Sequence, residues 1–152
     1  MNAIDLLKKQ HKEVKGLFKK LDKTEAGRDR RQLLDEIATA LAGHTTIEEE
    51  IFYQAVKALE TKKAEEMVAE AYEEHHVVKL VLAELPEVDV EDEQFEAKMT
   101  VLSELVEHHA DEEEDEMFKT AQKIGTDELE DLGARMGARF EEVAGKDHRR
   151  AA

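Results

Sequence analysis

The sequence predicts an all-α protein: an up-down-up-down four-helix bundle with a short extra helix at its C-terminal end. Charged residues make up 39% of the 152 residues and hydrophobic residues 41%, with one proline and seven glycines, a composition typical of long helices. The apolar residues recur at the three- and four-residue spacing of a helix face, and the sequence lacks the alternation of strands. A chain of this length suits one domain with a single core.

The expected helix boundaries follow from capping and breaking residues. Asn2 and Thr61 are expected to cap the first and third helices, because a side-chain oxygen there can accept from a free backbone N–H. Pro86 ends the third helix and Gly125 the fourth. The long helices are expected over residues 2–21, 28–59, 62–85 and 92–124. The chain thus divides into a bundle at 1–124, a C-terminal helix at 125–145 that packs on the bundle or makes a dimer contact, and a disordered tail at 146–152.

The charge balance restricts the partners and the location. The net charge of −16, from 22 basic and 38 acidic residues, argues against nucleic acid, since affinity there comes from neutralising phosphates. No apolar run reaches the roughly 20 residues of a membrane span, and residues 1–10 lack the apolar region of a signal peptide. The absence of cysteine excludes disulfides and thiolate metal sites, so a cytoplasmic protein is expected.

A histidine and a glutamate four positions apart lie at the centre of the second helix. His44 and Glu48 share one helix face, because residues four apart are neighbours on a helix surface. That face continues through Ile37, Leu41, Ile51, Phe52 and Ala55. Both polar side chains are therefore expected to point into the core, where a buried carboxylate needs compensation and a bound metal ion is the obvious candidate. Gly43, beside His44, would let a neighbouring backbone or ligand approach closely.

The same pattern recurs along the chain as an internal repeat. His11 in the first helix and His75 in the third are each followed by a valine three positions later. His109 and Glu113 in the fourth helix repeat the spacing of the pair in the second, and both pairs lead to an apolar residue followed by phenylalanine. Two helix pairs in pseudo-twofold relation would bring four imidazoles and two carboxylates to one level of the core.

These donor types narrow the choice of metal. Imidazole and carboxylate without sulfur favour iron, manganese or zinc over copper(I). Two carboxylates placed to bridge, with one or two histidines for each metal, suit a dinuclear iron centre. Such a centre can keep open positions for dioxygen, peroxide or nitric oxide.

The arrangement resembles the hemerythrin-like proteins, in the branch with HHE cation-binding domains. The resemblance covers residues 4–124, including the Glu-Glu-Glu-Ile-Phe-Tyr and Glu-Met-Phe stretches after the second and fourth histidines. It implies a non-haem di-iron centre, oxo- or hydroxo-bridged, in which Glu48 and Glu113 bridge two iron ions. The ligands that it implies are His11, His44, Glu48, His75, His109 and Glu113.

Two positions depart from the pattern of the oxygen-carrying hemerythrins. Those proteins have a second histidine one turn after the third-helix ligand, where this chain has Lys79. They also end with His-xxxx-Asp, where this chain has His109-xxx-Glu113. The centre would have fewer nitrogen ligands and more room, so peroxide turnover, nitric oxide chemistry or sensing is expected at least as much as reversible oxygen carriage.

The fourth helix leaves a choice between neighbouring residues. His108 and Glu112 have the same spacing as His109 and Glu113. The apolar residues around the pair favour His109, because a core-facing His108 would bring Glu104 into the core as well.

Three functions follow from this sequence. The first is a cytoplasmic di-iron protein that binds or transforms dioxygen, peroxide or nitric oxide, as an enzyme, a carrier or a sensor, and as a monomer or homodimer. The second is an iron-responsive interaction module, because metal binding and folding are coupled when the ligands are buried. The third is a metal-free bundle whose histidines hydrogen-bond the glutamates.

Overall fold

The computed structural model describes the backbone of residues 1–151 and the side chains of residues 1–145. Within that part of the chain no residue belongs to a β-strand. The division into 1–124, 125–145 and a disordered tail at 146–152 stays a prediction: the backbone of residues 146–151 is helical, while their side chains and residue 152 lie outside the described part of the chain. Among the helices that the structure describes, none combines the length and the apolar character needed to cross a membrane.

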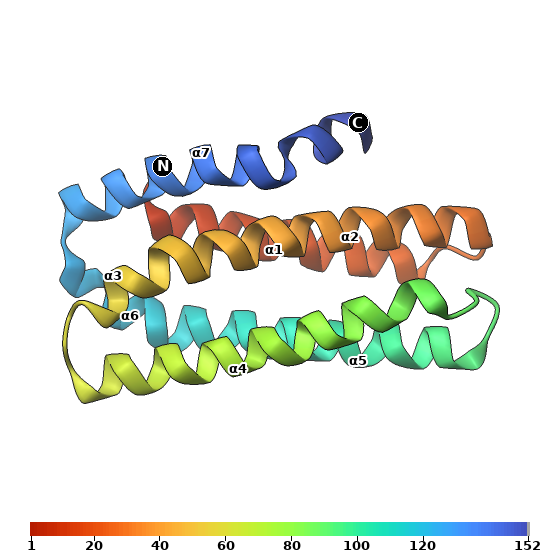
Figure 1. The fold of residues 1–152 in the computed structure, drawn as a ribbon, viewed down its shortest axis with the longest axis horizontal. Coiled ribbons are helices and arrows are strands. Elements are labelled where there is room, and N and C mark those ends of the chain that lie inside the picture. Colours follow the sequence, from red (N-terminus) through yellow and green to blue (C-terminus); the bar gives the residue numbers. More distant parts are fainter. Residues whose placement is uncertain (152) are drawn as a thin grey trace.

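Two antiparallel helix pairs form the bundle (Figure 1). The first pair is α1 (Ala3–Asp22) and α2 (Gly27–Ile47), and the second is α4 (Lys62–Glu84) and α5 (Glu93–Glu112). The 3-10 turn η2 (Leu85–Glu87) follows α4. Because the connections are short, consecutive helices run in opposite directions and lie side by side, which confirms the up-down-up-down bundle expected from the sequence.

The helix ends show why these segments begin where they do. The Asn2 side chain accepts a hydrogen bond from the backbone N–H of Asp5 at 2.8 Å, and the Thr61 hydroxyl accepts one from Ala64 at 3.1 Å. Both expected caps are therefore confirmed. Gly125 has a φ of 102°, a conformation that favours glycine, and it separates the fourth long helix from the last one.

The second and fourth helices were expected to be continuous α-helices, and here the structure corrects the prediction. A π-helical turn, η1 (Glu48–Phe52), follows α2 and leads into α3 (Tyr53–Lys57). A second one, η3 (Glu113–Met117), follows α5 and leads into α6 (Phe118–Ala121), which continues as the 3-10 turn η4 (Gln122–Ile124). Both π turns begin at a glutamate of the repeat. Single π turns inside α-helices often occur at functional sites.

Each π turn changes which residues face the core. An inserted residue rotates everything that follows, so Ile51 and Ala55, expected on the inward face, are only partly buried and pack against the core, whereas Phe52 is fully buried as expected. In the stretch after Glu48, the fully buried side chains are Phe52, Tyr53 and Val56. The same shift brings Phe118 into the core after η3.

The last helix, α7 (Thr126–Ala151), is 26 residues long, and so is longer than the short helix expected. It lies along α1 and α2, on the side of the bundle away from α4 and α5 (Figure 1). Its residues Leu129, Leu132 and Met136 are buried in the core. Gly43 of α2 lets α7 pack closely, because a Cβ there would lie 2.6 Å from Cε2 of Phe140.

The apolar core is divided into two clusters. One contains Phe52, Phe118 and Leu132 near the α3 and α6 end, and the other contains Ile37 and Phe95 towards the opposite end. Between them lies a layer of buried polar side chains, which is the candidate site.

Candidate metal centre

The six side chains implied as ligands come together in the polar layer between the two core clusters. They come from α1, α2, η1, α4, α5 and η3, and each is at most 7% exposed. These residues are His11, His44, Glu48, His75, His109 and Glu113. The structure also separates the neighbours that the sequence left open. His108 has a side chain 66% exposed and Glu112 one 39% exposed, whereas His109 and Glu113 point inward.

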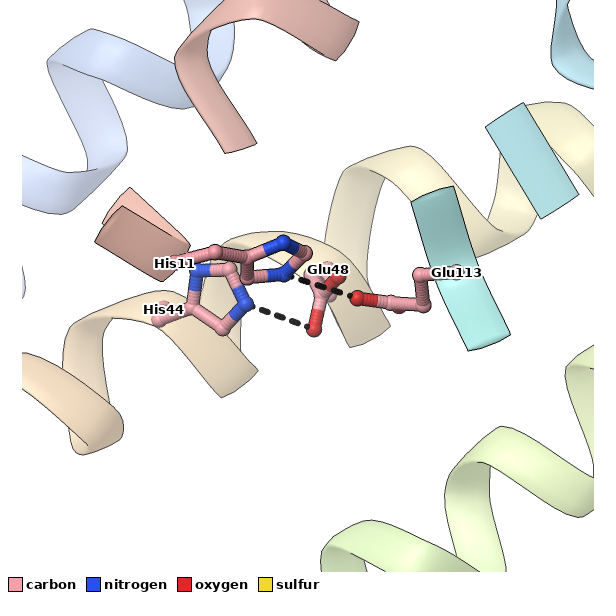
Figure 2. A group of neighbouring side chains, drawn as sticks. All are labelled: His11, His44, Glu48 and Glu113. Atoms are coloured by element: carbon pink, nitrogen blue, oxygen red, sulfur yellow. Dashed lines mark hydrogen bonds and ion pairs between the residues drawn. The ribbon is translucent and has the colours of Figure 1, made fainter. Parts of the chain in front are cut away.

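The histidines form two half-sites, with the two glutamates between them. In the first half-site, Nε2 of His11 lies 3.1 Å from Oε1 of Glu113, and Nε2 of His44 lies 3.1 Å from Oε1 of Glu48 (Figure 2). In the second half-site, Nε2 of His75 lies 3.0 Å from Oε1 of Glu48 and 3.1 Å from Nε2 of His109. His109 Nε2 lies 3.3 Å from Oε2 of Glu113. The two oxygens of Glu113 thus face different half-sites.

Two buried atoms at the centre fit a metal ion better than they fit an empty protein core. Oε2 of Glu48 and Nε2 of His44 have no hydrogen-bond partner within the described residues, since the 3.1 Å approach of His44 to Glu48 lacks hydrogen-bonding geometry. Buried polar atoms are nearly always paired, and leaving one unpaired costs free energy. An oxygen and a nitrogen of these types are donors for a cation such as zinc, manganese or iron.

The charges of the metal-free centre support the same interpretation. Burial lowers the pKa of His11 and His109, but the nearby Glu113 and Glu48 carboxylates outweigh it and raise both above the usual value. Burial also lowers the pKa of His75, but Glu48 and Glu49 outweigh it and raise that pKa above the usual value. Burial raises the pKa of Glu48, yet the charge of His44 and the surrounding hydrogen bonds hold it well below its usual range. These directions favour protons on His11, His75 and His109 beside the carboxylates when no metal is bound, and a bound cation would replace those protons.

Each histidine is held by a hydrogen bond from its other ring nitrogen, Nδ1. His11 donates to Glu114 at 2.9 Å and His75 donates to Glu49 at 2.8 Å. His44 donates to the amide oxygen of Gln10 at 2.7 Å, and His109 donates to Glu74 at 2.7 Å. With one proton held on Nδ1, each histidine would offer the Nε2 lone pair to a metal ion that displaces any proton there, which is the arrangement of metal-binding histidines.

Tyr53 is a site residue that the sequence reasoning missed. Its hydroxyl donates to Oε2 of Glu113 at 2.6 Å and lies 3.2 Å from Oε1 of Glu48. It also lies 3.1 Å from Nε2 of His75 and 3.2 Å from Nε2 of His109. Burial, followed by the charges of Glu113 and Glu48, raises the pKa of Tyr53 well above its usual value.

The π turn explains why Tyr53 was missed. Tyr53 lies five positions after Glu48 in the sequence. On a regular α-helix, two residues five positions apart point in different directions. The extra residue of η1 brings the tyrosine back to the face of the glutamate. The equivalent position after Glu113 is Phe118, whose ring stacks on His11 with 5.9 Å between ring centroids and 4° between ring planes. A signal was present in the sequence: Tyr53 and Phe118 are aromatic residues at the same position, five after the glutamate, in the two copies of the repeat.

Tyr72 and Lys79 lie one turn before and one turn after His75, and both contact Glu49 rather than the donor atoms at the centre. The Tyr72 hydroxyl donates to the backbone carbonyl oxygen of Glu49 at 3.0 Å. The Lys79 ammonium donates to the Glu49 carboxylate at 2.8 Å, from a side chain 53% exposed. The position where oxygen-carrying hemerythrins have a further histidine thus holds a residue directed at the periphery.

Comparison with known proteins gives the same family as the site residues. The Hemerythrin HHE cation binding domain matches residues 2–121. The uncharacterised protein Rv2633c of Mycobacterium tuberculosis and an uncharacterised protein of Mycobacterium bovis are each 34% identical to this chain over 148 residues. Those alignments cover 95% of this chain and 89% of each relative.

A solved structure shares the fold. It is the crystal structure of a hemerythrin HHE cation binding domain-containing protein from Mycobacterium kansasii, a homologue of Rv2633c. The two structures superpose with a TM-score of 0.84 at 32% sequence identity, over 96% of this chain and 89% of the other. With the helix arrangement, the buried histidine and glutamate cluster and these matches in agreement, the chain belongs to the hemerythrin family of HHE cation-binding domains.

Proposed function

We propose that this protein holds a dinuclear iron centre and uses it to bind or transform dioxygen, peroxide or nitric oxide. The proposed protein ligands are His11 and His44 in the first half-site and His75 and His109 in the second, with Glu48 and Glu113 bridging. The membership of a cation-binding family and the buried cluster support metal binding; the identity of the ion and of the small molecule is the proposal.

The observation that carries the proposal is the doubling of the donor set around shared carboxylates. One group of donor atoms comes from His11, His44, Glu48 and Glu113, and an overlapping group comes from Glu48, His75 and His109. Glu48 belongs to both groups, and Glu113 turns one oxygen towards each half-site. Because the donors fall into two groups that share a carboxylate, they suit two adjacent bridged ions better than a single ion.

The position of Tyr53 supports adding its oxygen to the second half-site. Ligand atoms that lie about 2.0–2.2 Å from one ion are roughly 3 Å from their neighbours. The Tyr53 hydroxyl oxygen is 2.6–3.2 Å from the donor atoms of Glu48, His75, His109 and Glu113. It thus has the spacing of a further donor atom, or of a hydrogen-bond donor to a molecule bound there.

The surroundings of the histidines suit a small, uncharged or singly charged molecule. A cavity of about 20 Å³ touches all four imidazoles, and its walls include the apolar side chains of Val14, Leu41, Val78 and Val106. A cavity of this size accommodates a molecule of two or three atoms. Bound iron would supply the redox chemistry and a coordination position, while the protein excludes bulk water and orients the ligand.

The first experiment is to purify the protein with iron and to measure metal content together with the visible spectrum. We expect two irons per chain and absorption bands that respond to azide or peroxide. Replacing His44 by alanine should remove the bands and reduce the iron content. His108→Ala is the matched control, because that histidine is exposed and should leave both unchanged.

Two outcomes would contradict the proposal or part of it, and activity measurements would then separate an enzyme from a carrier or sensor. Less than about half an equivalent of any metal after reconstitution would favour the metal-free bundle. Two zinc ions and no iron would keep the ligand set and remove the redox function. Oxygen evolution or peroxide loss that requires iron would identify an enzyme, whereas a stable, reversible oxygen adduct without turnover would identify a carrier or sensor.

A further inference from the structure

The two half-sites are related by the internal repeat, and most of their surroundings match. His11 corresponds to His75, His44 to His109, and Glu48 to Glu113. The outer partners of the first pair also correspond, because His11 donates to Glu114 at 2.9 Å and His75 to Glu49 at 2.8 Å. A carboxylate supports both of these histidines equally.

The two half-sites differ at the residue before His11 and at the corresponding residue before His75. Gln10 comes before His11 and accepts from His44, whereas Glu74 comes before His75 and accepts from His109. Both hydrogen bonds are 2.7 Å long, so the two partners hold their histidines at the same distance but differ in chemical type. Gln10 has an amide side chain and Glu74 has a carboxyl side chain, so only the second partner can carry a negative charge.

A carboxylate partner makes a histidine a stronger metal ligand than an amide partner does. It draws on the Nδ1 proton and so increases the electron density at Nε2, and loss of such a partner typically costs 10–100-fold in metal affinity (an order-of-magnitude range). Tyr53 adds an oxygen to the same half-site, where the first half-site has the apolar Phe118. Lys79 partly offsets the charge of Glu49, but it is more than half exposed and water screens it.

The two outer partners, Gln10 and Glu74, also differ in their exposure to solvent. Gln10 is 6% exposed, whereas the Glu74 side chain is 23% exposed. A cavity there has Glu70, Glu74, Glu112 and Glu116 around it, with His109 and Glu113 among its lining residues. Four carboxylates therefore surround this cavity beside the second half-site.

We propose that the two metal positions are unequal and fill in a fixed order, the His75 and His109 position before the His11 and His44 position, with Glu74 as the positioning residue that sets this order. This inference rests on the proposed dinuclear centre. It adds that a one-metal form exists at limiting metal, and that its ion is in the second half-site.

The test is a titration of the metal-free protein with Zn²⁺, followed by NMR of the histidine ring nitrogens and by calorimetry. At one equivalent we expect the ring signals of His75 and His109 to shift while those of His11 and His44 stay in place. The second equivalent should shift the remaining pair. We expect the two dissociation constants to differ by about 10–100-fold.

Exchanging the two partners tests the cause. Glu74→Gln should bring the two affinities together, and the double variant Gln10→Glu with Glu74→Gln should reverse the order of the ring shifts. A merely structural role of Glu74 would not reverse it. Glu73→Gln, the same chemical change at an exposed neighbour, should leave order and affinities as in the wild type. If the double variant fails to fold, the single Glu74→Gln titration still decides.

The outcomes separate this inference from the proposed function. Two zinc ions that bind together, or that fill the His11 and His44 position first, would overturn the fixed order and leave the dinuclear centre standing. An unchanged gap in Glu74→Gln would overturn the role of Glu74. A chain that takes up no second ion would overturn the dinuclear centre itself.

Discussion

The Tyr53 hydroxyl donates a 2.6 Å hydrogen bond to Oε2 of Glu113, and this bond links the two halves of the bundle at the level of the candidate centre. Tyr53 directly follows the π turn η1, and Glu113 begins the π turn η3. Both residues are almost fully buried, so the bond is shielded from water. A hydrogen bond between a neutral donor and a buried carboxylate is among the stronger ones in proteins.

Replacing Tyr53 by phenylalanine should destabilise the metal-free protein. The change keeps the ring and removes the donor to Glu113, so we expect the free energy of unfolding to fall by about 1–3 kcal/mol. Urea denaturation measures it. Tyr72→Phe is the comparison, because its hydroxyl donates to a backbone carbonyl from a partly buried position and should matter by about 1 kcal/mol or less. Equal stability of Tyr53→Phe and the wild type would show that the hydrogen bond contributes nothing.

Replacing Glu48 by glutamine should abolish tight metal binding at both half-sites. Glu48 is fully buried and its Oε1 faces His44 and His75, so an amide there would remove a donor that the two half-sites share. We expect metal affinity to fall by about a hundredfold or more, measured by calorimetry on the metal-free protein. Glu50→Gln, an exposed neighbour paired with Arg139, should bind metal as the wild type does. Retention of two metals by Glu48→Gln would remove Glu48 from the ligand set.

The stability of the metal-free protein should depend on pH in a defined direction. His11, His75 and His109 have folded-state pKa values raised above the ordinary 6.5, so their contribution is complete below about pH 6.5 and is lost as the pH rises through the folded values. Glu48 has a lowered pKa, so its contribution is present above about pH 4.5 and is lost as the pH falls through its folded value. The metal-free protein should therefore be more stable to urea at pH 5.5 than at pH 8.5 (test conditions chosen around these values).

Metal affinity should show the opposite trend, because the ion displaces protons from the histidines. Calorimetry in buffers of different ionisation enthalpy should detect proton release on metal binding. A metal-free protein whose unfolding free energy is the same at both pH values would contradict the raised histidine pKa values. His108→Ala, an exposed site, should not alter the trend.

Two glycine-to-alanine changes should have opposite signs. At Gly43 a Cβ would lie 2.6 Å from Phe140 and 3.0 Å from the Ala144 side chain, so α7 must move and we expect a net destabilisation of about 1–2 kcal/mol. At Gly16 a Cβ would meet nothing within 4 Å in the described part of the chain, so alanine should stabilise α1 by about 0.5–1 kcal/mol. Thermal and urea denaturation of both variants would decide. A stabilised Gly43→Ala would mean that α7 is not tightly packed there.

The sequence alone determined the bundle and the positions of the six candidate ligands. Helix periodicity and the caps at Asn2 and Thr61 depend on contacts within a few residues, so they can be read from the chain. The spacing of His44 to Glu48 and of His109 to Glu113 sets their common face by the same local geometry. The choice of His109 over His108 followed from the apolar residues around them, and the structure buries the former.

The tertiary structure decided the rest of the site. The π turns, and with them the inward position of Tyr53, depend on packing between helices that no local pattern reports. The pairing of His44 with Gln10 and of His109 with Glu74 joins residues 34 and 35 positions apart, and only the arrangement of neighbouring helices brings them together. Local spacing could thus show that the core carries two similar groups of histidine and glutamate, whereas the contacts that make the two groups unequal arise only when the helices pack.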